Sequence, residues 1–216
     1  MAVKTYSLKK DGNTSLSKNF KVKEFRSKDG ADEILIDKKL VKLLQKVRDK
    51  FGIVNISSAY RTKTHNARVG GVPNSQHRYG TAADITLTLS SAKKLLECAR
   101  YAEKIGFTGI GLDNKYQNFI HLDTRPNVSY FRYNSRGGTY SVPSFFNTVK
   151  RGMQSDDVKV LQKKLNENGF KGNKGEVLSA DGIFGSSTEY ALKNYQEANG
   201  LTADGVAGPK TWRKIY

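Results

Sequence analysis

Cysteine, proline and long apolar runs are all scarce in this sequence. The 216 residues include a single cysteine, Cys98, so no disulfide can form within the chain and the fold must be stabilised by its own core. No stretch approaches the ~18 consecutive apolar residues that a membrane span needs, which excludes a transmembrane protein. With 4 prolines, 37% hydrophobic and 26% charged residues, the composition also excludes collagen-like, coiled-coil and wholly disordered chains.

Acidic residues are few relative to basic ones. The chain has 37 Lys and Arg against 20 Asp and Glu, a net charge of +17. Residues 1–149 hold 26 of the basic and 12 of the acidic residues, so +14 of this charge lies there. Such a surface attracts polyanions. Nucleic acid, an anionic membrane and the anionic bacterial cell wall are all polyanions that such a surface could bind.

The amino-terminal residues also lack an apolar segment. Residues 1–15 read MAVKTYSLKKDGNTS, which has the positive charge of an export signal without its hydrophobic stretch. We therefore expect synthesis in the cytoplasm without a signal peptide.

The first part of the chain mixes helical and strand patterns. Apolar residues at helical spacing predict helices over 37–51 and 91–105, with Asp37 as the first N-cap. Short β-prone runs lie at 53–57, 82–89 and 119–123. We predict an α+β domain over 1–135, with a small, mainly antiparallel sheet and flanking helices.

The last part of the chain contains a near-duplication. Residues 180–188 read ADGIFGSST and are echoed by ADGVAGPKT at 203–211. Each copy has two glycines that permit a tight turn, followed by residues suited to starting a helix. We predict a small all-α domain over 150–216, with helices at 155–168, at 187–199 and from Pro209. The intervening segment 136–149, rich in Gly and Ser, is predicted to be a linker.

All three histidines lie in the first part. In the predicted strand 119–123, His121 and Asp123 face one side, while Ile120 and Leu122 face the other. His77 and Asp84 flank a turn at Gly80 that lets them converge. Two imidazoles and a carboxylate suit a catalytic zinc with an open position for water. The spacing alone leaves open that these are unrelated polar residues with local hydrogen bonds.

The run from Ser75 to Asp84 matches S-x-H-x-x-G-x-A-x-D, and it resembles the signature of the zinc D-alanyl-D-alanine carboxypeptidases, a family that includes phage L-alanyl-D-glutamate peptidases. The segments 56–62, 65–66, 69–71, 109–111 and 121–123 also resemble that family. The resemblance implies His77, Asp84 and His121 as zinc ligands. It implies Arg61 as the cation that holds a substrate carboxylate or stabilises the oxyanion.

One position departs from the family pattern. Several members carry a carboxylate, the general base, three residues before the last histidine, where this chain has Asn118. A carboxamide cannot accept a proton at neutral pH, so Asp123 becomes the first candidate base and Asp113 the second. The alternative for Asp123 is that it only orients a neighbouring imidazole. Ser75, His65 and Tyr60 are predicted to lie on the substrate side.

Residues 150–216 resemble a three-helix peptidoglycan-binding module. The resemblance lies in the motif Val158-x-x-Leu161-Gln162-x-x-Leu165, in the two duplicated loops and in the last helix with Trp212. Trp212 is either a core residue or a platform for a sugar, and its place in so small a domain favours the core.

Together these features predict a zinc-dependent peptidoglycan hydrolase that cleaves an amide bond of the stem peptide, as a D-Ala-D-Ala carboxypeptidase or as an endopeptidase. The family resemblance implies a phage or prophage endolysin. It would reach the cell wall after release at lysis, with peptidoglycan and anionic teichoic polymers as partners. The alternative is a noncatalytic peptidoglycan-binding protein on a degenerate peptidase fold. A nucleic-acid partner is not expected, since no zinc-finger spacing or aromatic–basic motif accompanies the charge.

Overall fold

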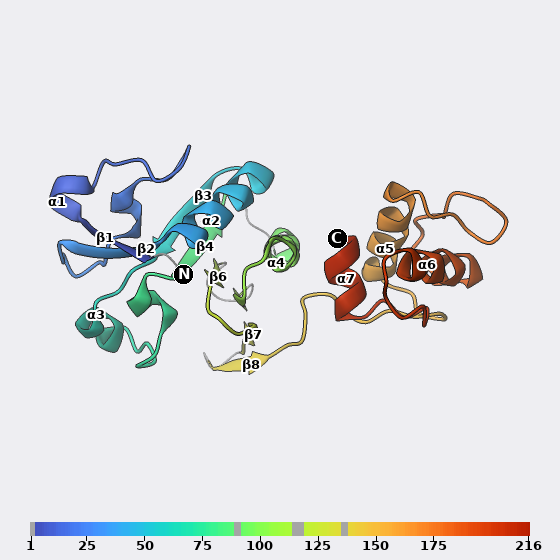
Figure 1. Ribbon diagram of the computed structural model, residues 1–216. Coiled ribbons are helices and arrows are strands. Elements are labelled where there is room, and N and C mark those ends of the chain that lie inside the picture. Colours follow the sequence, from blue (N-terminus) through green and yellow to red (C-terminus); the bar gives the residue numbers. More distant parts are fainter. Residues whose placement is uncertain (1–2, 89–91, 114–118, 135–137) are drawn as a thin grey trace. The chain divides into compact units, whose positions relative to one another are not determined.

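Figure 1 shows the computed structural model, which describes residues 3–88, 92–113, 119–134 and 138–216. The chain forms two compact units, Met1–Val142 and Pro143–Tyr216. The boundary falls inside the segment 136–149, which the sequence predicts to be a linker. Thr139–Ser141 forms a strand of the first unit, while Phe146 and Val149 belong to the core of the second.

A six-stranded sheet organises the first unit. In spatial order its strands are β3 (Val54–Ser58), β4 (Ala82–Leu87), β6 (Phe119–Asp123), β5 (Gly109–Asp113), β7 (Ser129–Tyr133) and β8 (Thr139–Ser141). All neighbouring strands are antiparallel except β5 and β7. The predicted mainly antiparallel sheet is therefore confirmed, and two of its predicted strands, β4 and β6, are direct neighbours near its centre.

Two long helices, α2 (Lys38–Phe51) and α4 (Ala92–Ile105), pack against each other and against this sheet. Both match the predicted amphipathic helices. The Asp37 side chain caps α2 by accepting from the Lys39 N–H, and Gly52 ends the helix with a φ of 85°. Cys98 is fully buried within α4, and burial raises its pKa to about 12, so this thiol is a core group and not a nucleophile.

A smaller two-stranded sheet precedes α2. β1 (Val3–Ser7) pairs antiparallel with β2 (Glu33–Asp37), and between them lie α1 (Leu8–Asp11) and the 3₁₀ helix η1 (Val22–Phe25). None of these elements was predicted from the sequence. Phe20 and Phe25 pack edge to face at 6.1 Å and anchor this region in the core.

The second unit is a three-helix domain, as predicted, formed by α5 (Asp156–Glu167), α6 (Ser186–Ala198) and α7 (Pro209–Ile215). Trp212 is fully buried and stacks on Phe146 with ring centroids 4.5 Å apart, while its indole N–H donates to the Asn147 carbonyl at 2.9 Å. It is therefore a core residue. Across the described parts of both units, no helix is long and apolar enough to cross a membrane.

The duplicated loops of this domain are held by twin side-chain networks. Gln162 donates to the Asp181 carboxylate, the Ile183 carbonyl and the Thr188 hydroxyl, and accepts from the Gly182 N–H. The same four bonds recur around Gln196, where the partners are Asp204, Val206, Thr211 and Gly205. The repeat in the sequence thus encodes a repeated clasp between a helix and the loop packed against it.

Candidate metal centre

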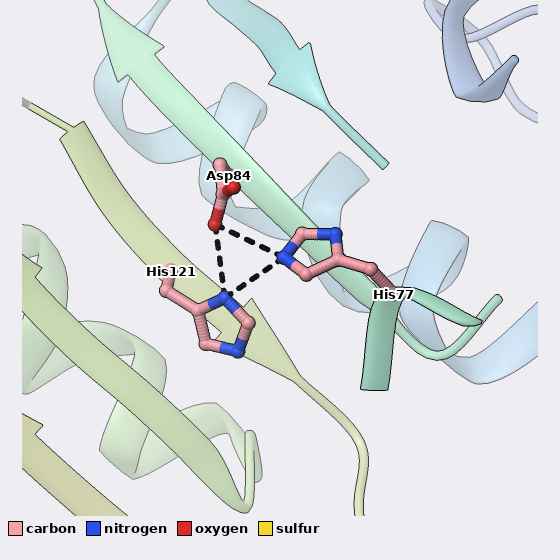
Figure 2. A group of neighbouring side chains, drawn as sticks. All are labelled: His77, Asp84 and His121. Carbon is pink, nitrogen blue, oxygen red and sulfur yellow. Dashed lines mark hydrogen bonds and ion pairs between the residues drawn. The ribbon is translucent and has the colours of Figure 1, made fainter. Parts of the chain in front are cut away.

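His77, Asp84 and His121 come together at one point (Figure 2). His77 lies on the 3₁₀ helix η2 (Gln76–Tyr79), Asp84 on β4 and His121 directly opposite it on β6. His77 Nε2 lies 3.2 Å from His121 Nδ1 and 3.3 Å from Asp84 Oδ1. His121 Nδ1 lies 2.9 Å from Asp84 Oδ1. The predicted convergence is present in the structure.

The turn at Gly80 brings His77 to the sheet. Gly80 ends η2 with a φ of 66°, and a Cβ there would lie 2.2 Å from the Leu35 carbonyl oxygen. Only glycine satisfies both conditions. The chain then enters β4 through Ala82 and Ala83, both fully buried.

Both imidazoles direct a lone pair toward the centre. His77 Nδ1 donates to the Ala59 carbonyl at 2.6 Å, which leaves Nε2 free to bind a cation. His121 Nε2 donates to Asp123 Oδ2 at 2.8 Å, which leaves its Nδ1 free to bind a cation. Metal-bound histidines are fixed in this way by a partner on the opposite nitrogen.

The donor set fits zinc. Ligands about 2.0–2.2 Å from a tetrahedral zinc ion lie roughly 3.3–3.6 Å from one another, slightly more than the separations seen here. Three protein ligands also leave a fourth position for water, which is the pattern of catalytic sites.

The charges of the centre favour a bound cation. Burial alone would raise the pKa of the Asp84 carboxyl, but the charge of His77 and the hydrogen bonds from both histidines hold it well below its usual range. Burial alone would lower the pKa of His121, yet the hydrogen bonds to Asp123 and Asp84 raise it to about 9. The three residues therefore attract a positive charge, either a proton or a metal ion.

Asp123 lies on the predicted face of β6, behind the His121 ring. Its side chain is fully buried, and Arg125 donates to it through Nε at 2.8 Å as well as through the backbone N–H. Burial would raise the pKa of Asp123, but the hydrogen bonds from His121 and Arg125 lower it. Of the two roles left open by the sequence, this geometry favours the orientation of His121.

Two glycines of β5 make room for this arrangement. A Cβ at Gly109 would lie 2.0 Å from the Asp123 carboxylate, and one at Gly111 would lie 2.3 Å from the Phe131 ring. Phe131 in turn lies 5.7 Å from the His121 ring, centroid to centroid. The Gly109-Ile-Gly111 motif is therefore needed because larger residues would collide with the groups that support His121.

Arg61 binds the second oxygen of Asp84. Its Nη2 donates to Asp84 Oδ2 at 2.8 Å and its Nε to the Ser58 hydroxyl at 2.8 Å. The guanidinium also lines a cleft of about 870 Å³ that contains the three candidate ligands. In the described part of the chain, Asp84 is the only carboxylate along this cleft, against three cationic side chains, those of Lys28, Arg61 and Arg125.

The predicted substrate-side residues separate into two groups. Ser75 lines the cleft at the start of η2. Tyr60 and His65 are not among the described residues that line it. Tyr60 is buried with its hydroxyl 3.5 Å from Glu33, and His65 is buried on α3 (Lys63–Arg68) with Nδ1 at 3.2 Å from Arg68. Asn118 lies outside the described residues, as does the side chain of Asp113.

Several residues of the cleft are not predicted by the sequence. Arg125 follows β6 by two residues, and its proximity to the His121-Leu-Asp123 motif was the available signal. Phe131 and Tyr133 come from β7, which pairs with β5 and carries no motif of its own.

The structure thus defines a two-unit chain with a candidate metal centre at the floor of an open cleft. The sequence pattern of the Peptidase M15 family matches residues 16–123, half of the chain, and this chain belongs to that family. The pattern described as a putative peptidoglycan binding domain matches residues 154–215. Both resemblances seen in the sequence are confirmed.

Individual relatives are similar over about a third of this chain. The spore cortex-lytic enzyme of Bacillus cereus is 46% identical over 72 residues, which are 33% of this chain and 26% of that protein. The zinc D-Ala-D-Ala carboxypeptidase of Streptomyces albus G is 42% identical over 69 residues, 32% and 26% of the two proteins. The solved SleB N-terminal domain is 40% identical, covers 32% of this chain and 89% of its own, and has a TM-score of 0.29. The aligned part is thus about a quarter of the length of these two curated relatives.

Proposed function

We propose that this chain is a zinc-dependent hydrolase that cleaves an amide bond in the stem peptide of peptidoglycan. The observation that carries the proposal is the convergence of one carboxylate and two imidazole nitrogens within 4.8 Å at the floor of the cleft. Membership of a peptidase family and a second unit that matches a peptidoglycan-binding domain support the choice of substrate. So do relatives named as a cortex-lytic enzyme and a D-Ala-D-Ala carboxypeptidase.

His77, Asp84 and His121 would hold the ion. Zinc bound there would polarise the scissile carbonyl and lower the pKa of water to ~7. Ala59 and Asp123 keep the two imidazoles in the ligating tautomer, and Arg61 fixes the carboxylate of Asp84. These contacts hold the three candidate ligands in position before substrate binds, which limits the reorganisation that the reaction requires.

The cleft favours an anionic peptide. Lys28, Arg61 and Arg125 line it and can bind carboxylates, of which a stem peptide carries several. We assign Arg61 to the carboxylate or oxyanion nearest the ion, because its guanidinium already contacts Asp84. Phe131 covers one flank of His121 and helps to exclude water from that side.

For the biological setting we propose an endolysin, made in the cytoplasm and acting on the cell wall after release. The relatives that are named spore cortex-lytic enzymes offer a second setting, the spore cortex.

The proposal is tested by digestion of purified vegetative peptidoglycan and of spore cortex, with mass spectrometry of the released fragments. We expect stem-peptide cleavage that stops with chelator and returns with zinc, and faster release from vegetative walls. Fragments cut only in the glycan would contradict cleavage of the stem peptide. No fragments from either substrate would contradict the enzymatic proposal and favour a noncatalytic binding protein. Faster release from cortex would contradict the endolysin setting alone.

A further inference from the structure

A second groove lies in the first unit, between β1, the loop 14–17 and α2. Its volume is about 690 Å³, and it shares no lining residue with the cleft of the candidate metal centre. Ile36 and Val41 are buried in its floor, and Tyr6 and Leu16 are half-buried there. Polar side chains also line it, namely those of Thr14, Ser15, Ser17 and Gln45.

A row of lysines forms one wall of this groove. Lys38, Lys42 and Lys46 are spaced by four residues on α2, so their side chains follow one another along one face of the helix, about 6 Å apart along its axis. Lys4 stands on β1, and its Nζ lies 4.9 Å from the centre of the Tyr6 ring. All four lysines are exposed, none is in an ion pair with another described residue, and no carboxylate lines the groove.

The basic surface continues into a neighbouring hollow. This hollow, of about 380 Å³, shares Thr14 with the groove and is lined by Lys9, Lys10 and Lys23, again without a carboxylate. Seven lysines therefore line these two adjoining hollows. A continuous path of like charge suits an extended polyanion better than a single small anion.

The groove wall is fixed by hydrogen bonds. Gln45 of α2 accepts from the Ser17 hydroxyl and from the Asn19 N–H, and it donates to the Asn19 side chain at 2.9 Å. The loop that forms the second wall is thereby tied to the helix that carries the lysines. A wall already in place lowers the ordering cost of binding.

We propose that this lysine groove binds a linear phosphodiester polymer of the bacterial cell wall, of the teichoic type. The lysine row matches a chain with regularly spaced negative charges, and the apolar floor with its flanking hydroxyl groups suits polyol or sugar units between the phosphates. A concave groove with lysines on both α2 and β1 fits one flexible chain, whereas a lipid surface is flat and a nucleic-acid duplex is stiff. The inference rests on the groove alone and not on the proposed hydrolysis.

The test is calorimetric titration of the full chain with purified soluble teichoic acid. We expect Lys38→Gln/Lys42→Gln/Lys46→Gln to weaken binding about ten- to a hundredfold, as the loss of three exposed ion pairs predicts. The slope of log K against log salt should fall in magnitude by roughly 2. The matched control Lys39→Gln/Lys50→Gln/Lys63→Gln removes the same charge from exposed positions outside the groove and should bind nearly as the wild type does.

Hydrolysis of a soluble stem peptide and the thermal unfolding midpoint should be unchanged in both triple variants. Equal weakening in the two variants would overturn the proposal, because it would show that diffuse charge does the binding. Absence of binding to teichoic acid would also overturn it. So would tighter binding, at matched phosphate concentration, to duplex DNA or to phosphatidylglycerol vesicles.

Discussion

His121 is held between two carboxylates, each paired with its own arginine. Its Nδ1 faces Asp84, which Arg61 contacts, and its Nε2 faces Asp123, which Arg125 contacts. Asp84 lines the cleft, whereas the side chain of Asp123 has no exposed surface. The two carboxylates on one imidazole therefore have different tasks, one as a candidate ligand and one as a positioning group.

Substitution of Asp123 separates positioning from proton transfer. We expect Asp123→Asn to weaken zinc affinity by ~10–100-fold, because the partner of His121 Nε2 becomes a poorer acceptor. Activity should return toward that of the wild type when zinc is saturating. Zinc affinity by competition with a chelating dye and turnover at saturating zinc are the two measurements.

The opposite outcome identifies Asp123 as the base. A general base typically contributes ~10²–10⁴ in rate, and that loss would persist at saturating zinc with metal affinity unchanged. The buried position of Asp123 and its bonds to Arg125 predict the first outcome.

At the scale of elements, the central strands explain most of the site. β4 and β6 place Asp84 opposite His121, and β5 places Gly111 beside His121 on the other side. Because side chains alternate along each strand, the face with these residues is the cleft face, while Ile85 and Ile120 are buried on the helix side.

Gly111 tests the close packing of this face. We expect Gly111→Ala to cost about 1–3 kcal/mol in the free energy of unfolding, because the new methyl group would overlap the Phe131 ring. The cost should shrink when Phe131→Ala is made in the same chain, which calorimetric unfolding of the four proteins in this cycle measures. An equal cost in both backgrounds would show that the ring is not what excludes the methyl group.

The twin clasps of the second unit make a separate prediction. Gln162→Leu leaves the Gly182 N–H and its neighbours without their buried partner, so we expect a loss of about 2–4 kcal/mol. Gln196→Leu should cost a similar amount. Urea unfolding followed by fluorescence of Trp212, the only tryptophan, reports on this unit.

Exposed Gln154 supplies the control for both variants. Gln154→Leu in the same unit should change stability by no more than about 0.5 kcal/mol. A cost for Gln162→Leu as small as that of Gln154→Leu would show that the clasp contributes little.

The sequence predicted elements that have strong periodicity. α2, α4 and the three helices of the second unit follow their apolar stripes, and β6 follows its alternation. β5 and β7 were missed: β5 contains two glycines, and its parallel partner β7 lies well apart from it in the sequence. The alternation of side chains along β6 also predicted the correct face for Asp123. The contacts with Arg125 and Gly109 place its carboxylate beside Nε2 of His121. Such contacts leave no local pattern in the sequence.

At the scale of the whole molecule, we propose that the first unit carries out hydrolysis and that the second keeps the enzyme on its substrate. The candidate metal centre and the lysine groove belong to Met1–Val142, and Pro143–Tyr216 is a separate compact unit with its own core. A module that keeps an enzyme on an insoluble substrate raises the effective substrate concentration.

Removal of Pro143–Tyr216 should therefore leave cleavage of a small soluble stem peptide unchanged. It should abolish cosedimentation with peptidoglycan that has been stripped of phosphate polymers, while intact walls retain part of the binding through the lysine groove. Sedimentation with both preparations is the measurement. Undiminished binding of the truncated chain to stripped peptidoglycan would show that the first unit does the anchoring.

The most direct test of the central claim is the zinc content of four purified proteins, measured by elemental analysis after equilibration with equimolar zinc. Wild type and His65→Ala should each retain one zinc ion per chain, because His65 lies outside the cluster of candidate ligands. His77→Ala and His121→Ala should retain almost none while keeping their fold by circular dichroism. Full zinc occupancy in either of these two variants, or loss of zinc from His65→Ala, would contradict the assignment of the metal centre.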